Sequence, residues 1–139
     1  MSNFKYTAGL NNVGSYQVSG APFLTSSVDA TQAVKVEFPY VTSWVIIQNN
    51  AHNSAMDLKV GFSQNGVEGT NYFWLYNRYN NSSQDRSSIL PPLKLKLTEI
   101  WVSGSDDVEI IAGLTNIPVE RINNISPSGS NWSGSIGVG

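Results

Sequence analysis

Hydrophobic and polar residues alternate with a period of two through the middle of the chain. In residues 33–38, three apolar side chains fall on one face of an extended segment and two charged side chains fall on the other. This pattern is typical of a strand with one buried face. The more continuous apolar run at residues 43–48 instead indicates a strand covered on both faces. Further strands are expected at residues 57–62, 71–76, 93–97, 100–102 and 108–114.

Turn signals separate many of these segments. Asn65 and Gly66 form a pair typical of a two-residue hairpin turn, and residues 103–106 combine Gly with Ser and Asp. Pro39 and Pro118 each limit a strand, because proline has no amide hydrogen to donate. No stretch combines sustained helical spacing with helix caps. The chain is therefore predicted to be all-β, a single β-sandwich of about six to eight strands in jelly-roll or Greek-key-like order.

The two ends of the chain lack this alternation. Residues 1–32 scatter apolar side chains among Gly and Ser, and we expect them to form an extended N-terminal docking arm. Residues 121–139 form a Gly/Ser-rich C-terminal tail, which leaves residues 33–120 as the β-sandwich domain. The side chains expected to bind a partner protein are Phe4, Tyr6, Leu10, Val13, Tyr16, Phe23 and Leu24 in the arm and Trp132 in the tail.

Charged residues are scarce in this chain. They make up 13% of its 139 residues, with a formal net charge of −2, against an average share of about 25%. Asn and Ser together supply 34 residues, which suits turns and close contacts between proteins. There is no basic cluster to neutralise phosphates, so we expect no nucleic-acid partner. No apolar run approaches the length of a membrane helix or a signal peptide, so we expect synthesis in a cytoplasm and no membrane association.

Residues that perform catalysis or hold metals are few. The absence of cysteine excludes disulfides and thiolate ligands. His52 lies in an Asn-rich turn without an acidic neighbour, and Asp106 and Asp107 lie in a turn where Asp bonds to nearby backbone. The serines show no nucleophile elbow, and no phosphate-binding loop is present. We therefore expect no enzyme activity, cofactor or metal; a small hydrolase with two carboxylates facing each other across strands is a further alternative.

Residues 71–79 are rich in aromatic side chains, at both odd and even positions, which point to opposite faces of a strand. Some of these side chains therefore face away from any single core. Trp and Tyr next to Asn and Arg are typical of surfaces that stack on sugars or anchor protein interfaces, while burial between two sheets is the other interpretation. The candidate glycan platform consists of Tyr72, Trp74, Tyr76 and Tyr79.

The N-terminal stretch YTAGLNNVGSYQVSGAPFLT, residues 6–25, is distinctive. It resembles the N-terminal signature of small virion structural proteins of marine tailed phages, especially cyanophages. The pieces VEFPYVT (36–42), LKLTEIWVS (95–103) and AGLTNIP (112–118) are similar to that group as well, whereas residues 63–90 show no such likeness. The resemblance implies a β-sandwich protein of the capsid or tail, present in many copies, with a decoration, cement, fibre or vertex role.

Two functions follow as expectations. The first is a non-enzymatic virion structural protein that assembles onto a phage particle, at its capsid or tail, through the N-terminal arm, and decorates or cements it. Its expected partners are other virion proteins, such as the major capsid or tail protein, and further copies of the chain, for instance in a trimer. We expect it in the virion after synthesis in the host cytoplasm. The alternative is a carbohydrate-binding, host-attachment module that uses the aromatic platform.

Overall fold

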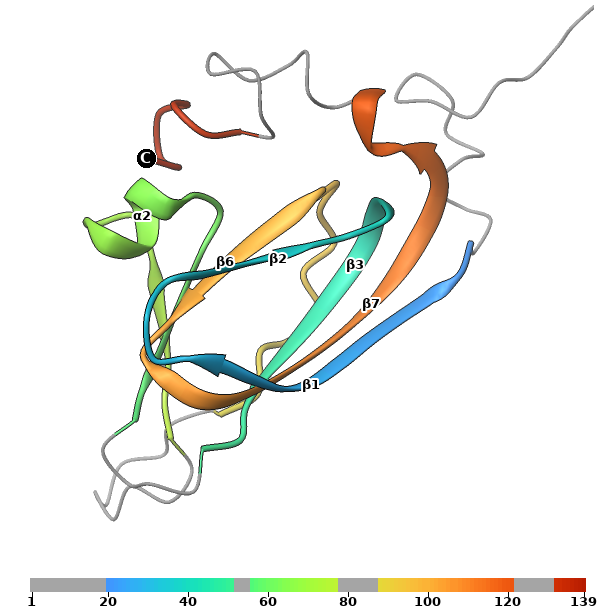
Figure 1. Ribbon diagram of the computed structural model, residues 1–139. Helices are drawn as coiled ribbons and strands as arrows, with labels where there is room; N and C mark the ends of the chain where they lie inside the picture. Colours follow the sequence, from blue (N-terminus) through green and yellow to red (C-terminus); the bar gives the residue numbers. More distant parts are fainter. Residues whose placement is uncertain (1–19, 52–55, 78–87, 122–131) are drawn as a thin grey trace, which may run out of the picture.

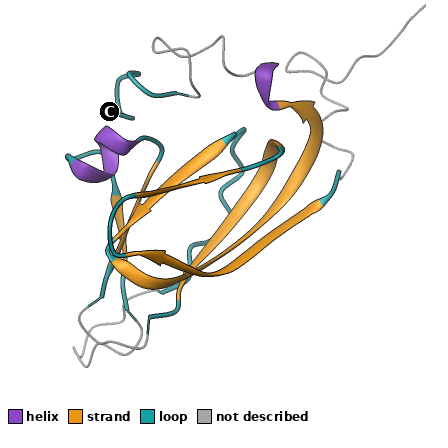
Figure 2. Ribbon diagram, viewed as in Figure 1, coloured by secondary structure: helices purple, strands orange, loops and turns teal. Residues whose placement is uncertain are grey.

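The computed structural model describes residues 20–51, 56–77, 88–121 and 132–139. In these residues two antiparallel sheets pack against each other (Figures 1 and 2), which confirms the predicted all-β sandwich. The elements are β1 (Pro22–Ala30), β2 (Val34–Glu37), β3 (Tyr40–Asn49), β4 (Leu58–Gly61), α2 (Gln64–Glu68), β5 (Phe73–Leu75), β6 (Glu99–Ser103), β7 (Ser105–Pro118) and the 3-10 helix η1 (Val119–Arg121). One sheet has three strands in the order β1-β7-β3, and the other has four in the order β2-β6-β4-β5.

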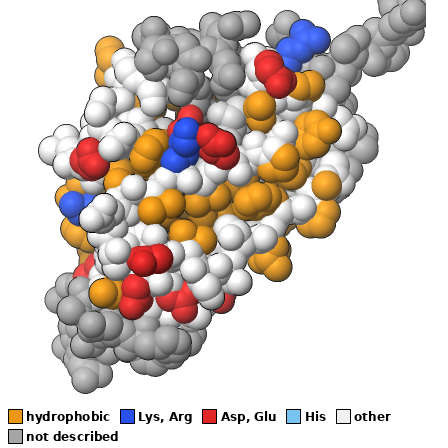
Figure 3. All heavy atoms as spheres, in the orientation of Figure 1, with side chains coloured by type: hydrophobic (Ala, Val, Ile, Leu, Met, Phe, Trp, Pro, Cys, Tyr) orange, Lys and Arg blue, Asp and Glu red, His pale blue; other side chains and the backbone are white. Residues whose placement is uncertain are grey.

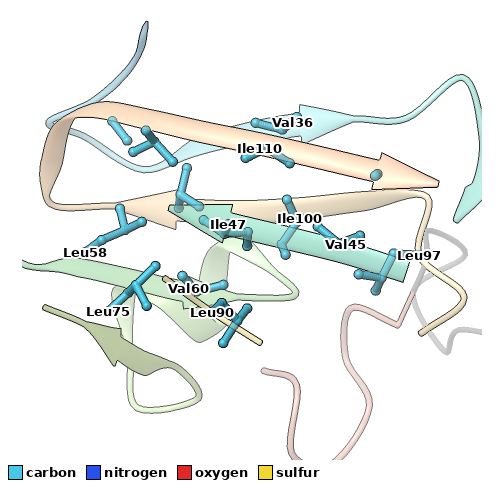
Figure 4. Packing of buried hydrophobic residues seen from close by; sticks show 14 of the residues in the cluster. Val36, Val45, Ile47, Leu58, Val60, Leu75, Leu90, Leu97, Ile100 and Ile110 are labelled. Carbon is cyan, nitrogen blue, oxygen red and sulfur yellow. The ribbon is translucent and has the colours of Figure 1, made fainter. Parts of the chain in front are cut away.

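The inner faces of the two sheets share one hydrophobic core. Ile47 of β3 and Ile110 of β7 are neighbours across the three-stranded sheet. They pack in the same cluster as Ile100 of β6 and Val60 of β4 (Figure 4). All four side chains are fully buried, and each burial contributes roughly 1.5–3 kcal/mol relative to exposure. Alternate residues of each strand supply these contacts, as the period of two predicts.

Gly104 is the point where the chain crosses from one sheet to the other. It lies between β6 and β7, and its φ of 116° belongs to a region that L side chains rarely adopt. A Cβ at this position would also collide with the carbonyl oxygen of Asp57. The amide of Gly104 donates to the carbonyl oxygen of Ala30 at 2.6 Å. The turn predicted at residues 103–106 is therefore reduced to Gly104, because Ser103 ends β6 and Ser105 already begins β7 in the other sheet.

A buried amide ties the two sheets together at the end of β3. Asn49 is 1% exposed. Its Nδ2 donates to the carbonyl oxygens of Met56 at 2.9 Å and of Leu75, in the four-stranded sheet, at 3.2 Å. Its Oδ1 accepts from Oγ of Ser105, in the three-stranded sheet, at 2.7 Å and from the amide of Ala51 at 3.3 Å. One side chain thus satisfies buried polar groups of both sheets.

The strand β1 lies where the sequence predicted a docking arm. Pro22–Ala30 pairs with β7, so the expected boundary at residue 32 is corrected and this stretch belongs to the sandwich. The pairing extends to Gly20, whose amide donates to the carbonyl oxygen of Leu114 at 2.8 Å. Two register shifts and a φ of 54° at Ser27 interrupt the alternation. The hydrophobic pattern therefore did not reveal this strand.

Residues 93–97, the clearest alternating run in the sequence, form an extended segment but not the predicted strand. The run makes one isolated bridge with β3. Beyond it, the hydroxyl of Thr42 donates to the carbonyl oxygen of Leu95 at 2.7 Å and accepts from the amide of Leu97 at 3.0 Å. The side chain of Thr42 thus takes the place of part of the backbone pairing, beside a backbone bond from its amide to the carbonyl oxygen of Leu97 at 2.9 Å. The two preceding prolines have no amide hydrogens. The leucines still face the core, which accounts for the alternation.

The pair Asn65 and Gly66 lies in α2, and the predicted hairpin turn is therefore wrong. The hydroxyl of Ser63 caps this helix by accepting from the amide of Gly66 at 2.9 Å. The same hydroxyl donates to the carbonyl oxygen of Val138 at 2.8 Å. That carbonyl lies so close to Gly66 that a Cβ would not fit. The contact between α2 and the chain's last residues (Figure 1) therefore determines the local structure.

The substitution Asn49→Ala is expected to lower the free energy of unfolding by about 2–4 kcal/mol. It removes the hydrogen bonds that join the sheets and leaves buried partners unsatisfied. Urea denaturation followed by tryptophan fluorescence measures the loss. Asn116→Ala is the control, because Asn116 is exposed in β7, and should change stability by less than about 0.5 kcal/mol. Equal losses in the two variants would contradict the role assigned to the amide.

Candidate functional site

Three aromatic side chains share the outer side of β5, the edge strand of the four-stranded sheet. Tyr72, Trp74 and Tyr76 have the same parity, so they lie on one face of this extended segment. Leu75 has the opposite parity and is buried in the core, at 2% exposure. Trp74 is 41% exposed. The structure therefore brings three of the four residues of the predicted glycan platform to one solvent-facing surface.

The three aromatic rings contact one another in sequence. The rings of Tyr72 and Trp74 meet edge to face, with centroids 5.4 Å apart and an interplanar angle of 83°. The rings of Trp74 and Tyr76 are nearly parallel, with an angle of 22° and centroids 6.5 Å apart. Both arrangements are favoured for aromatic pairs, and each adds about 0.5–1.5 kcal/mol. The rings therefore hold one another in a defined orientation.

Lys59 of β4 completes this surface. It pairs with Trp74 in the strand register. Its Nζ lies 4.7 Å from the ring centroid of Tyr72 and 5.4 Å from that of Trp74, within the range of cation–π attraction. Among the described residues, no carboxylate forms an ion pair with Lys59. We call Lys59, Tyr72, Trp74 and Tyr76 the aromatic surface.

Another lysine on the same sheet has a different environment. Nζ of Lys35 in β2 lies 2.7 Å from Oε1 of Glu37. The hydrogen bond to Glu37 raises the pKa of Lys35. Its charge is therefore balanced by an acidic neighbour, whereas the charge of Lys59 faces aromatic rings.

An open hollow of about 330 Å³ adjoins the aromatic surface. Its lining includes Tyr72 and the neighbouring polar residues Thr70 and Asn71, together with Phe62 and Phe73, which pack against the core. The hollow combines polar groups with aromatic side chains, which is the mixture that small-molecule sites use to fix a ligand's orientation. Sugar-sized ligands that reach Tyr72 would therefore find hydrogen-bonding groups beside it.

A second surface lies on the outer side of the three-stranded sheet. Leu24 of β1, Ile111 of β7 and Ile46 of β3 are register partners across the three strands. Leu24 is 72% exposed and Ile111 is 38% exposed. The three side chains line a shallow hollow of about 110 Å³. We call them the apolar row.

The strands β1 and β2 form one open side of the sandwich. Each is the edge strand of its sheet within the described residues. Phe23 and Val28 of β1 and Val34 of β2 pack on the core but remain partly exposed. Figure 3 shows hydrophobic side chains in a band across this side of the molecule. The apolar row and this open edge both involve β1.

Two side chains expected to bind a partner instead pack on the chain's own sandwich. The ring of Phe23 meets that of Phe38 edge to face at 5.1 Å, and the ring of Trp132 meets that of Phe62 at 6.1 Å. Both also pack against the core cluster. Of the predicted partner-binding residues that the structure describes, Leu24 is the one whose side chain points to solvent. The predicted residues Phe4, Tyr6, Leu10, Val13, Tyr16 and Tyr79 lie outside the described residues, as does His52.

Sequence reasoning missed Ile46, Ile111 and Lys59. A signal for Ile111 was present, because Ile110 and Ile111 are adjacent in one strand and only one of them can face the core. The outward parity of Lys59 was also visible in the alternation of residues 57–62. What the sequence did not contain was the register that places Lys59 beside Trp74.

The described residues contain little that would hold a metal. No three or more His, Cys, Asp or Glu side chains gather within that part of the chain. Asp106 and Asp107 lie in β7, and the amide of Asp107 donates to Oγ of Ser105 at 3.3 Å, a local hydrogen bond of a Ser hydroxyl to the backbone. No helix in the described ranges is both long enough and apolar enough to cross a membrane.

Comparisons with protein-family models, with curated proteins and with solved structures find no match. The resemblance of residues 6–25 to phage virion proteins therefore stays a prediction. The features of the described residues that bear on function are the aromatic surface, the apolar row and the open edge beside β1.

The substitution Trp132→Ala is expected to lower the free energy of unfolding by about 1–3 kcal/mol, below the cost of a fully buried Trp because this ring is partly exposed. Thermal unfolding in dilute solution measures the loss, which should not depend on protein concentration. Ile136→Ala is the control, because the side chain of Ile136 is fully exposed. A loss that appears only in concentrated solution would contradict the intramolecular role and assign Trp132 to a contact between copies.

Proposed function

We propose that the chain is a non-enzymatic structural protein of a phage virion, which assembles through β1 and decorates or cements the particle. The observation that carries the proposal is the apolar row. Leu24 is 72% exposed beside Ile111 and Ile46, and contiguous apolar surface of this kind marks sites of protein interaction. Covering it with another protein contributes a gross hydrophobic term of about 25 cal/mol for each Å² removed from water, from which the entropy cost of association is subtracted.

Composition supports the same interpretation. Charged residues make up 13% of the chain, so identical copies can approach with little electrostatic repulsion. The stretch that resembles virion proteins, residues 6–25, runs directly into Pro22–Ala30, the strand that carries Leu24. The segment expected to dock and the exposed edge strand are therefore contiguous in the chain.

The proposed partners are further copies of the chain and another virion protein of the capsid or tail. An edge strand favours such contacts, because its outward amide and carbonyl groups can pair with an extended segment of a neighbour. In a closed symmetric assembly such as a trimer, β1 of every copy would meet the same complementary surface of its neighbour. Multiple contacts then add up to strong binding even where each one is weak.

The substitution Leu24→Asp is expected to leave the sandwich folded, because the side chain is 72% exposed. It should nevertheless reduce incorporation into virus particles by about tenfold or more, because the contact would bury an unpaired carboxylate. Quantitative mass spectrometry of purified particles measures the number of copies, and circular dichroism of the isolated variant verifies the fold.

Two further variants complete this experiment. Trp74→Ala removes an exposed side chain from the other sheet and should be incorporated normally. Deletion of residues 1–19 ends before Gly20 and so preserves the pairing of β1; it should fold but be excluded from particles. Absence of the unmodified chain from purified particles, or normal incorporation of Leu24→Asp, would overturn the proposal.

A further inference from the structure

The aromatic surface has no role in the proposed assembly through β1. Three rings of one parity lie in a row along an edge strand, with neighbouring centroids 5.4 and 6.5 Å apart. Trp74, in the middle of the row, is 41% exposed. The C–H groups on one face of a pyranose ring pack on aromatic rings, so a sugar unit can stack on the exposed ring of Trp74. The neighbouring rings of Tyr72 and Tyr76 hold that ring in its orientation.

Lys59 determines the chemical class of that carbohydrate. Its Nζ lies 4.7 Å from the ring centroid of Tyr72 and 5.4 Å from that of Trp74. Within the described part of the chain, no carboxylate forms an ion pair with it. An ammonium group has three donors, and a charge-assisted hydrogen bond to an anion is stronger than a neutral one. An anionic group on a sugar that stacks on Trp74 would lie within reach of Lys59.

The neighbouring hollow supplies a third element. Thr70 and Asn71 line it beside Tyr72, and their polar groups can pair with sugar hydroxyls. We propose that the aromatic surface and this hollow bind an acidic carbohydrate, a chain of pyranose units that carries carboxylate or sulfate groups. This site lies on the four-stranded sheet, whereas the apolar row lies on the three-stranded sheet. The inference therefore does not depend on the assembly proposal.

Binding of the full chain to three soluble polymers tests the inference. Alginate carries carboxylates, dextran sulfate carries sulfates, and dextran is neutral. Isothermal titration calorimetry at physiological ionic strength is expected to show binding to at least one acidic polymer, with an affinity about tenfold or more above that for dextran. Tighter binding of alginate would indicate a carboxylate ligand, and tighter binding of dextran sulfate would indicate a sulfate ligand. Similar binding of both would indicate that the site recognises negative charge of either kind.

Variants at the site separate stacking from charge. Trp74→Ala should weaken binding about tenfold or more, and Trp74→Phe, which keeps a ring, should weaken it less. Lys59→Gln should remove most of the preference for the acidic polymer over dextran, because the charge is lost while the rings remain. Circular dichroism verifies that each variant is folded, and the Lys59 and Trp74→Phe variants preserve the test if Trp74→Ala does not fold.

The matched controls lie elsewhere on the molecule. Lys94→Gln removes the same charge from an exposed position, and Tyr40→Ala removes an aromatic side chain that is 45% exposed in β3. Both should bind like the unmodified chain. The inference is overturned if no polymer binds or if dextran binds as well as the acidic polymers. It is also overturned if Lys94→Gln weakens binding as much as Lys59→Gln does.

Discussion

Burial of the inner faces of the two sheets is the interaction on which the other features depend. The chain has no cysteine, and the core between β3, β7, β4 and β6 stabilises the sandwich through hydrophobic contact. Because strands alternate with a period of two, every strand that supplies this core also directs side chains outward. Both candidate surfaces arise in this way: Leu75 is buried while Trp74 faces solvent, and Ile110 is buried while Ile111 faces solvent.

The sequence predicted the fold class and most of the strands, because alternation reports directly on burial. It failed where something other than alternation determines the backbone. The bulged β1 lacks the pattern, and the last residues of the chain pack where Asn65 and Gly66 suggested a hairpin. The hydroxyl of Thr42 bonds to the backbone of Leu95 and Leu97 in place of a regular strand ladder. The aromatic row could be predicted from its parity. Its contact with Lys59 could not be predicted, because the register between β4 and β5 has no local signal in the sequence.

The two proposed surfaces lie on different sheets, so both can be occupied in the same copy at the same time. A copy that is held in an assembly through β1 can still present Trp74 and Lys59 to a ligand. The tightly buried core between the sheets keeps the two surfaces in a fixed relation. This arrangement suits a protein that contacts its own assembly on one sheet and an external carbohydrate on the other.

Hydrogen–deuterium exchange tests the central claim, assembly through β1, most directly. It compares the chain free in dilute solution with the chain in purified particles. Amides of Pro22–Ala30 that do not face β7 have no partner strand among the described residues, and they should exchange quickly in the free chain. The account predicts that assembly slows exchange in β1 and leaves Phe73–Leu75 of β5 unchanged. Unchanged exchange in β1, or protection confined to β5, would contradict it.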